Sequence, residues 1–300
     1  MQTDKFEGAH GKQLEMYVWE TESPKAVVLI VHGMAEHMAR YDDFAKYLNS
    51  KGIIAAGLDL RGHGQTDNNT LGYCEGEMWK DSIIDQVMFA QKLKEKYGVK
   101  LVVLGHSYGS FITQALIEES TAADMYILSG SCYMKSIEVL LGNIIAKSIE
   151  KHKGGQAKAE QIFNMTFGAY DKKFNGKAAW LSRDKAQVEK YNNDEMCGYC
   201  CSAHFYVSFF NGLTELYKKE NLQKVDINIP IYIYSGSVDP VGKAGSGVKK
   251  LYDMYKKLGV RNLNMKLYEN GRHEMLNELN NVEVYIDVVE TILQTLKCDI

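Results

Sequence analysis

The apolar residues of this chain fall into short continuous runs that alternate with longer periodic segments. Strands buried on both faces of a sheet show continuous apolar runs, whereas strands with one exposed face alternate apolar and polar residues. Residues 12–20 alternate in the second way, which predicts a half-exposed antiparallel edge strand with residues 6–9 as its hairpin partner. The continuous runs predict a parallel sheet covered by helices, and they span residues 26–31, 53–60, 101–104, 125–128 and 229–234.

Helical spacing occupies the intervals between these runs. In residues 79–96, for example, Ile83, Val87 and Ala90 lie on one helical stripe. Strands that alternate with helices in this way predict an α/β fold with a mostly parallel central sheet flanked by helices. The other helical segments expected between strands are residues 41–48, 107–119, 247–257 and 282–296.

One interval interrupts the alternation of strands and helices. Residues 131–225 separate two predicted strands, and a structureless loop of that length is not expected inside a compact domain. Residues 136–149 and 199–217 have helical spacing within it. We therefore predict a helical cap over residues 131–225, inserted into a core domain made of residues 1–130 and 226–300.

The apolar stripe of residues 136–149 has two interpretations. Its side chains can line an entrance for an apolar substrate, or they can pack the cap onto the core, which is the more common use of an amphipathic stripe. Peripheral contact of the cap with a membrane is a further role left open by the sequence. The stripe consists of Ile137, Leu140, Leu141, Ile144 and Ile145.

Composition narrows the classes of function open to this chain. Its 300 residues include 35 basic and 38 acidic residues, a formal net charge of −3, so there is no basic surplus for binding nucleic acid. The first residues are polar, without the apolar segment of a secretory signal, and no apolar run approaches the roughly 18 residues of a membrane span. Six scattered cysteines indicate reduced thiols rather than a disulfide framework. We therefore expect a cytoplasmic globular protein.

The segment Gly105-His106-Ser107-Tyr108-Gly109 joins a predicted strand directly to a predicted helix. This G-x-S-x-G pattern places a serine at a strained turn, with its hydroxyl exposed at the end of a sheet and at the positive end of a helix. The two glycines lack Cβ atoms, so the strand and the helix can approach each other closely. Partner residues elsewhere in the chain decide between a nucleophile and an ordinary turn with a capping serine.

A serine nucleophile needs an imidazole base oriented by a carboxylate, and in α/β-hydrolases the chain order is Ser, then Asp or Glu, then His. Of the eight histidines, His273 is the one that follows the strands predicted in the last part of the chain, and it lies in a glycine-containing loop. Asp239 follows the strand at residues 229–234, whereas Asp226 precedes it and would lie at the opposite edge of the sheet. A loop histidine or an Asp-Pro turn is common by itself. Jointly, Ser107, Asp239 and His273 fit one catalytic triad.

An ester hydrolase also needs hydrogen-bond donors for the oxyanion. One donor is the backbone N–H of the residue after the nucleophile, here Tyr108, and the second comes from the loop after an early strand. The strand at residues 26–31 leads into His32-Gly33-Met34, where Gly33 lets the backbone turn its N–H groups inward. The backbone N–H of Met34 is the predicted second donor.

Six segments, spread over nearly the whole chain, carry a resemblance to a known family. They are His32-Gly33-Met34-Ala35-Glu36-His37, Gly57-x-Asp59-x-Arg61-Gly62-His63-Gly64-x-Thr66, Gly105-His106-Ser107-Tyr108-Gly109, Trp180-Leu181-Ser182-Arg183-Asp184, Gly236-x-x-Asp239-x-Val241 and His273-Glu274. Together they resemble the α/β-hydrolase fold, and more narrowly its monoacylglycerol lipase and lysophospholipase-like branch, which is sometimes grouped with serine aminopeptidases. The resemblance implies that Ser107 is the nucleophile, His273 the general base and Asp239 its orienting partner. It also implies that residues 61–64 shape a loop near the site.

The cysteine-rich segment Cys197-Gly198-Tyr199-Cys200-Cys201 departs from that family pattern. With His204, its spacing could suggest zinc, but no second pair of ligands occurs at a similar spacing elsewhere. Buried cysteines commonly act as small apolar side chains, and we expect that role here rather than a metal site.

The sequence predicts a serine esterase that cleaves a small, lipid-like carboxylic ester without a metal or an organic cofactor. Monoacylglycerol or lysophospholipid hydrolysis follows from the resemblance, and a short-chain or aromatic carboxylesterase or a thioesterase is the alternative. An aminopeptidase is less favoured, because no residue pattern provides an anchor for a peptide amino terminus. Ser107 counts against haloalkane dehalogenases and epoxide hydrolases, which use an aspartate nucleophile. A non-catalytic binding protein on this fold is expected to lack a triad residue.

Overall fold

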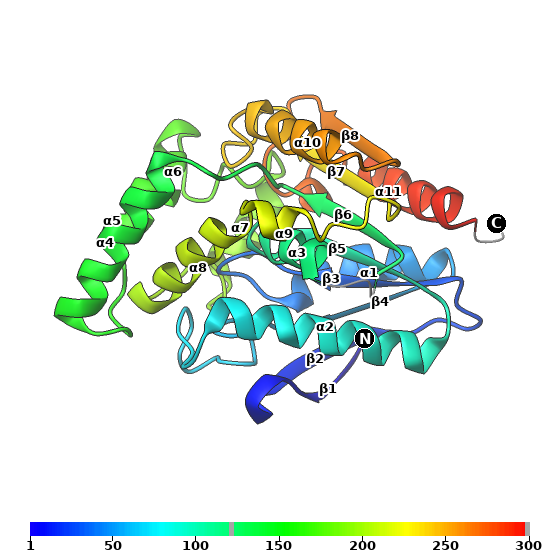
Figure 1. The fold of residues 1–300 in the computed structure, drawn as a ribbon, viewed down its shortest axis with the longest axis horizontal. Coiled ribbons are helices and arrows are strands. Elements are labelled where there is room, and N and C mark those ends of the chain that lie inside the picture. The colour runs from blue at the N-terminus through cyan, green and yellow to red at the C-terminus, as the bar shows by residue number, and fades with distance from the viewer. Residues whose placement is uncertain (120–122, 298–300) are drawn as a thin grey trace.

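The computed structural model describes residues 1–119 and 123–297. Within these residues, eight strands form a single sheet in the order β1-β2-β4-β3-β5-β6-β7-β8 (Figure 1). Strands β3 to β8 pair in parallel, while β2 pairs with both β1 and β4 in the antiparallel sense. The strands are β1 (Gln2–Glu7), β2 (Gln13–Trp19), β3 (Ala26–Val31), β4 (Ile53–Leu58), β5 (Lys100–His106), β6 (Met125–Ser129), β7 (Ile231–Gly236) and β8 (Leu263–Tyr268).

The continuous apolar runs reflect burial on both faces of the sheet. In β3, Val27 and Leu29 belong to one apolar core, and Val28 and Ile30 belong to a second core on the opposite face. Because adjacent residues of a strand point to opposite faces, every position of such a strand must be apolar. The predicted mostly parallel sheet is therefore confirmed.

Both edges of the sheet differ from the sequence-based expectation. The segment of residues 12–20, in which apolar and polar residues alternate, forms β2. This strand is not at the edge of the sheet, because β1 pairs along its outer side from Gln2 to Glu7. Five of the six β1 residues are exposed, so an apolar pattern could not indicate the strand. At the other edge, β8 was not among the continuous runs, since most of its residues are only partly buried or exposed.

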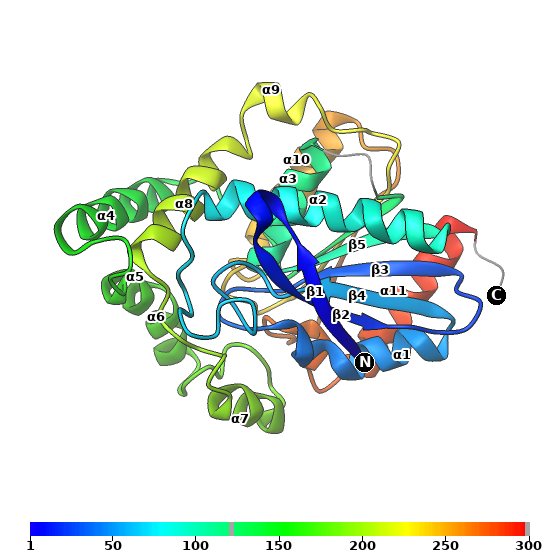
Figure 2. The same ribbon diagram turned by 90° about the horizontal axis from the view of Figure 1, so that it is seen from below.

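Five helices cover the two faces of the sheet. Helices α1 and α11 pack on one face through residues such as Phe44 and Val284. Helices α2, α3 and α10 pack on the other face through residues such as Phe89, Phe111 and Val248 (Figure 2). All five correspond to predicted segments, and their bounds are α1 (Asp42–Ser50), α2 (Met78–Tyr97), α3 (Tyr108–Glu119), α10 (Ser246–Leu258) and α11 (Asn281–Leu296).

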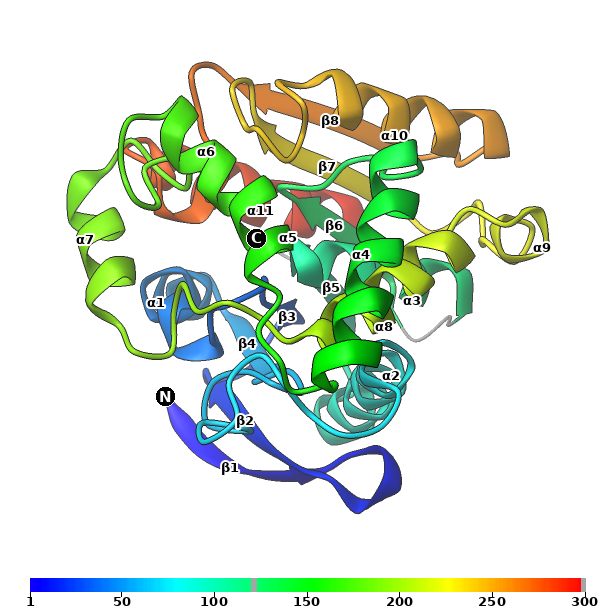
Figure 3. The same cartoon turned by 90° about the vertical axis from the view of Figure 1, so that its left-hand side faces the viewer.

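The remaining helices lie between β6 and β7, in the segment of residues 131–225 that we call the insertion. Helices α4 to α8 gather beyond one end of the sheet, which Figure 3 shows from that side, whereas α9 lies next to α3. The two segments with helical spacing became α4 and α8, which pack against each other. The other four are short and were not predicted. The helices of the insertion are α4 (Ile137–Lys153), α5 (Glu160–Met165), α6 (Phe167–Lys173), α7 (Lys185–Asn193), α8 (Ala203–Glu215) and α9 (Lys219–Leu222).

The apolar stripe of α4 points mainly to solvent. Ile137, Leu140, Leu141 and Ile144 are between 52 % and 63 % exposed. The buried side of α4 consists instead of Val139, Asn143 and Ala146, and the Asn143 amide donates a hydrogen bond to Asn211 of α8 at 2.9 Å. The interpretation that this stripe packs the insertion onto the core is therefore wrong for these four residues. Within the described residues, no helix is both long enough and apolar enough to cross a membrane.

Candidate active site

Ser107 lies at a sharp turn between β5, which ends at His106, and α3, which begins at Tyr108. Its φ of 51° is in the left-handed region, which is strained for a residue with a side chain. A Cβ atom at Gly105 would meet the Gly109 carbonyl, and one at Gly109 would collide with the Val31 carbonyl of β3. The close approach predicted for the two glycines is thus confirmed, and it forces Ser107 out of the end of the sheet.

Asp239 and His273 lie in the loops that follow β7 and β8. Their side chains are 0 % and 1 % exposed, and Nδ1 of His273 is 2.9 Å from Oδ2 of Asp239. Ser235 Oγ and the Val241 N–H also donate to the Asp239 carboxylate, at 3.1 Å and 2.8 Å. Loops at the carboxyl ends of adjacent parallel strands meet at one edge of a sheet. This topology brings together two residues that are 34 positions apart in sequence.

The charge of Asp239 controls the protonation of this pair. Burial acts to lower the pKa of His273, but the negative charge and the hydrogen bond of Asp239 outweigh it and raise that pKa above its ordinary value. Burial acts in the opposite direction on Asp239, yet the charge of His273 and several hydrogen bonds hold the pKa of Asp239 below its usual range. The pair therefore stabilises an imidazolium next to a carboxylate.

Two aromatic rings hold the imidazole of His273 in place. Its centroid lies 4.8 Å from that of His106 and 5.1 Å from that of Trp180. Nε2 of His273 is buried and makes no hydrogen bond within the described residues. Burial and the nearby His273 lower the pKa of His106 to about 4, so His106 stays neutral beside the base at neutral pH. The arrangement leaves one buried nitrogen of His273 available to exchange a proton.

The loop after β3 passes directly beside Ser107. A Cβ atom at Gly33 would lie 3.2 Å from Cβ of Ser107. The Gly33 N–H donates to Oε1 of Glu36 at 2.6 Å, and Ala35 adopts a left-handed φ of 55°. The backbone N–H groups of Met34 and Tyr108 have no hydrogen-bond acceptor among the residues that the structure describes. Their role as oxyanion donors stays a prediction, and the proximity of Gly33 to Ser107 supports it.

A buried charge network, not recognised in the sequence, joins this loop to the loop of His273. Arg40 makes two hydrogen bonds to the carboxylate of Glu274, at 2.8 Å and 2.7 Å, and pairs with Glu36 at 2.5 Å. Burial opposes ionisation of Glu274, but Arg40 outweighs it and lowers the pKa of Glu274 to about 2. Glu36 and Glu274 belong to two of the motifs that carry the family resemblance. Those motifs could have indicated in the sequence that these two residues matter for the site. Because Glu36 also accepts from Gly33, the network fixes the two loops relative to each other.

Residues of the insertion also support the loop of His273. The backbone N–H groups of His273 and Glu274 donate to the carbonyls of Trp180 and Leu181, at 3.3 Å and 2.7 Å. Arg183 adds an ion pair with the buried Glu278 at 2.9 Å. The motif that begins at Trp180 therefore docks the insertion against the loop of His273.

With the geometry described, the chain can be compared with known proteins. Residues 22–280, most of the chain, match the family described as serine aminopeptidase, S33. The chain belongs to the S33 family. A monoglyceride lipase of Mus musculus is 25 % identical over 275 residues, which are 91 % of this chain and 84 % of that protein.

Two solved structures share the fold of this chain. An open-form lipase has a TM-score of 0.87 at 24 % identity, and the match covers 98 % of each chain. A thermostable carboxyl esterase from Bacillus coagulans, in complex with glycerol, has a TM-score of 0.88 at 23 % identity over 97 % of each chain. These similarities confirm the α/β-hydrolase fold expected from the sequence.

The remaining motif residues of this S33 chain have structural roles. Arg61 pairs with the buried Asp85 at 2.7 Å and donates to the Ala9 carbonyl. His63 is fully buried, and its ring stacks 6.0 Å from that of Tyr108. These contacts support the expectation that residues 61–64 shape a loop near the site.

Three of the residues that the spacing suggested for a metal site, Cys200, Cys201 and His204, do not come together as a cluster of ligands within the described residues. Both ring nitrogens of His204 already have partners: Nδ1 lies 2.8 Å from Oε1 of Glu150, and Nε2 lies 2.8 Å from the Gly76 carbonyl oxygen. The Cys200 thiol donates to the Cys201 carbonyl at 3.5 Å. Within the described residues, neither Cys200 nor Cys201 belongs to a cluster that could hold a metal ion.

Proposed function

We propose that this protein hydrolyses carboxylic esters of lipid-like alcohols, with monoacylglycerol as the leading substrate. One observation carries the proposal. The buried Asp239–His273 pair, with Nε2 of His273 unpaired among the described residues, lies at the same edge of the sheet as the strained Ser107. The S33 family match and the lipase relative support the same class of reaction.

In this mechanism, His273 takes the proton of Ser107 through Nε2 as the Ser107 oxygen attacks the ester carbonyl. Asp239 stabilises the imidazolium that forms, in keeping with the raised pKa of His273. The N–H groups of Met34 and Tyr108 donate to the oxyanion of the tetrahedral intermediate. His273 then returns the proton to the departing alcohol and activates the water that releases the acid. No step requires a metal or an organic cofactor.

Charge pairing near the site favours esters over peptides. An aminopeptidase binds the ammonium group of its substrate best with a carboxylate that no other charge neutralises. Among the described residues near the oxyanion loop and His273, the carboxylates of Glu36 and Glu274 are both paired with Arg40, and that of Asp239 is paired with His273. The alternatives that remain within the class are lysophospholipids, short-chain or aromatic esters and thioesters.

The insertion is proposed to act as a cap domain of residues 131–225 on a core of residues 1–130 and 226–300. Its exposed apolar side chains on α4 would contact lipid aggregates or a membrane surface, because such a patch is costly to leave in water. We also propose a cytoplasmic location, since the five cysteines of the described residues are free thiols.

A charged substitution on α4 tests this use of the insertion. We expect the double variant Leu140→Glu and Ile144→Glu to hydrolyse micellar or vesicle-bound monoacylglycerol about tenfold more slowly, because two apolar side chains can no longer enter the lipid. Hydrolysis of a soluble short-chain ester should be unchanged. Ile286→Glu on α11, which lies far from α4 in Figure 1, is the matched control and should affect neither substrate. Equal losses on both substrates would contradict the proposal.

A substrate panel tests the proposed reaction itself. Purified protein would be assayed with p-nitrophenyl esters of graded acyl length, monoacylglycerol, lysophospholipid, a thioester and an aminoacyl p-nitroanilide. We expect the highest kcat/KM for a monoacylglycerol and no turnover of the p-nitroanilide. Preferential cleavage of the p-nitroanilide would replace the ester proposal with the aminopeptidase activity that the family description mentions.

A further inference from the structure

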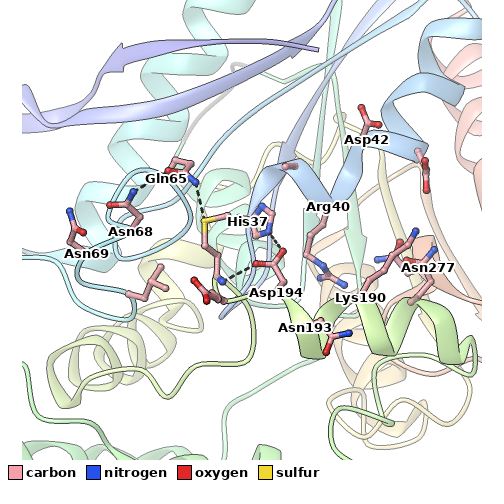
Figure 4. Close-up of a pocket in the computed structure, with 16 residues that line it drawn as sticks. His37, Arg40, Asp42, Gln65, Asn68, Asn69, Lys190, Asn193, Asp194 and Asn277 are labelled. Atoms are coloured by element: carbon pink, nitrogen blue, oxygen red, sulfur yellow. Dashed lines mark hydrogen bonds and ion pairs between the residues drawn. The ribbon is translucent and has the colours of Figure 1, made fainter.

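A second cluster of ligand-type side chains lies where the insertion meets the loop after β3. Asp194 and Cys197 stand at the two ends of a turn after α7, in which the Cys197 N–H donates to the Asp194 carbonyl at 3.0 Å. The third side chain is His37, whose Nε2 contacts Oδ2 of Asp194 at 2.8 Å (Figure 4). One imidazole nitrogen, one carboxylate oxygen and the Cys197 sulfur all lie within 4.8 Å of one another.

The three donor types are those that zinc prefers. Imidazole nitrogen, thiolate sulfur and carboxylate oxygen bind Zn²⁺ at about 2.0–2.3 Å, so neighbouring ligands of a tetrahedral ion lie about 3.5 Å apart. The observed separations of up to 4.8 Å require the ligand atoms to close by roughly 1 Å when the ion binds. Cys197 and His37 are 9 % and 4 % exposed, so two of the donors are already withdrawn from water.

One further observation supports a cation at this position. His37 is 4 % exposed, and its Nδ1 makes no hydrogen bond within the described residues, which is rare for a buried polar atom. Burial raises the pKa of the Cys197 thiol, so the thiol gives up its proton only when a bound cation replaces it.

Solvent can reach the cluster through a cavity of about 1080 Å³. His37 and Asp194 line this cavity, together with polar side chains such as Gln65 and Asn193 (Figure 4). The cavity provides an entry path for an ion, and room for a water molecule as the fourth ligand.

We propose that His37, Asp194 and Cys197 form a Zn²⁺ site that fastens the insertion to the loop carrying the Met34 amide. Cys197 binds as a thiolate and releases its proton to solvent, while His37 binds as the neutral imidazole. The two segments are already in contact, because the Gly198 N–H and the Tyr191 hydroxyl both donate to the Ala35 carbonyl, at 3.0 Å and 3.1 Å. The ion adds a further link between them, and this role does not depend on which ester the protein cleaves.

The experiment measures Zn²⁺ binding by the full-length protein, in competition with a chromophoric chelator. We expect one ion to bind to this site, and Cys197→Ser and Asp194→Asn each to weaken that binding about 100-fold or more. At a Zn²⁺ concentration about 100 times Kd, Tm of the native protein should rise by about 5 °C. With Co²⁺ in place of Zn²⁺, a sulfur-to-metal charge-transfer band should appear in the native protein and be absent from Cys197→Ser.

The controls separate this site from adventitious binding to other thiols. Cys200→Ser and His204→Gln change the residues that the sequence spacing pointed to, and both should bind Zn²⁺ as the native protein does. Asp194→Asn removes a partly exposed carboxylate, so it provides a folded variant if the more deeply buried positions tolerate no change. Native affinity in Cys197→Ser, or a Tm that Zn²⁺ leaves unchanged in the native protein, would overturn the proposal.

Discussion

The variant Ser107→Ala is expected to lose ester hydrolysis almost completely, with kcat lower by about 10⁶-fold. The loss should be this large because the acyl-enzyme cannot form without the hydroxyl, and the oxyanion donors alone supply only a small residual rate. A fluorophosphonate probe, which reacts covalently with activated serines, should label the native protein and not the variant. Ser107 has a left-handed φ and stands at the turn between β5 and α3, which is the position proposed for the nucleophile.

Ser110→Ala provides the matched control for this experiment. Ser110, in α3, lies one helical turn after Ser107, and its hydroxyl donates to the Ser107 carbonyl at 2.6 Å and lies 2.8 Å from the Ser131 hydroxyl. No imidazole or carboxylate of the described residues contacts the Ser110 hydroxyl, so its removal should leave fluorophosphonate labelling in place. Labelling that persists in Ser107→Ala and disappears in Ser110→Ala would show that the wrong serine had been assigned.

The parts of the fold that could be predicted are those in which burial dictates residue type locally. In β3, both faces are covered, so all six positions are buried and the strand is recognisable without its neighbours. The turn at Ser107 could be predicted for a similar reason, because glycine is the residue that the close approach at positions 105 and 109 permits. In each case, the structural requirement acts on residues that lie within a few positions of the sequence pattern that indicates it.

The parts that could not be predicted depend on contacts between distant segments. The bidentate pair of Arg40 with Glu274 joins residues 234 positions apart, and nothing near either residue indicates its partner. The cluster of His37 with Cys197 is similar, since the local spacing grouped Cys197 with Cys200, Cys201 and His204 instead. Charged and ligand-type residues have no periodicity that indicates their partners. Their pairing becomes visible only once the loops at the carboxyl ends of the strands have been brought together.

The stripe on α4 shows a different limit of sequence patterns. Helical spacing identifies that a helix has an apolar side, but it does not say whether that side meets protein or solvent. The small residue Ala146, together with Val139, made the contact with the rest of the protein, while the larger Ile137 and Leu141 remained exposed. An exposed stripe of large apolar residues is costly in water, so the departure from the expected packing is itself the observation that supports contact with lipid.

Replacement of His273 by alanine is expected to reduce kcat by about 10³-fold or more, because no other group in the described site can accept the Ser107 proton. The native enzyme should also lose activity as the pH falls, since only the neutral imidazole acts as a base. Asp239 raises the pKa of His273, so the midpoint of this acidic limb should lie above the ordinary histidine value of about 6.5. The measurement is kcat/KM as a function of pH on a soluble p-nitrophenyl ester.

The conservative variant Asp239→Asn tests the cause of that pKa shift. Without the carboxylate charge, burial is the dominant remaining influence on His273 and lowers its pKa, so the acidic limb should move to lower pH. The plateau rate should fall about 10⁴-fold, because the neutral amide no longer stabilises the imidazolium or selects its tautomer. His152→Ala, on the exposed end of α4, is the control and should leave both limb and plateau unchanged. Near-native turnover in His273→Ala, or an acidic limb that Asp239→Asn leaves in place, would exclude this pair as the base and its orienting partner.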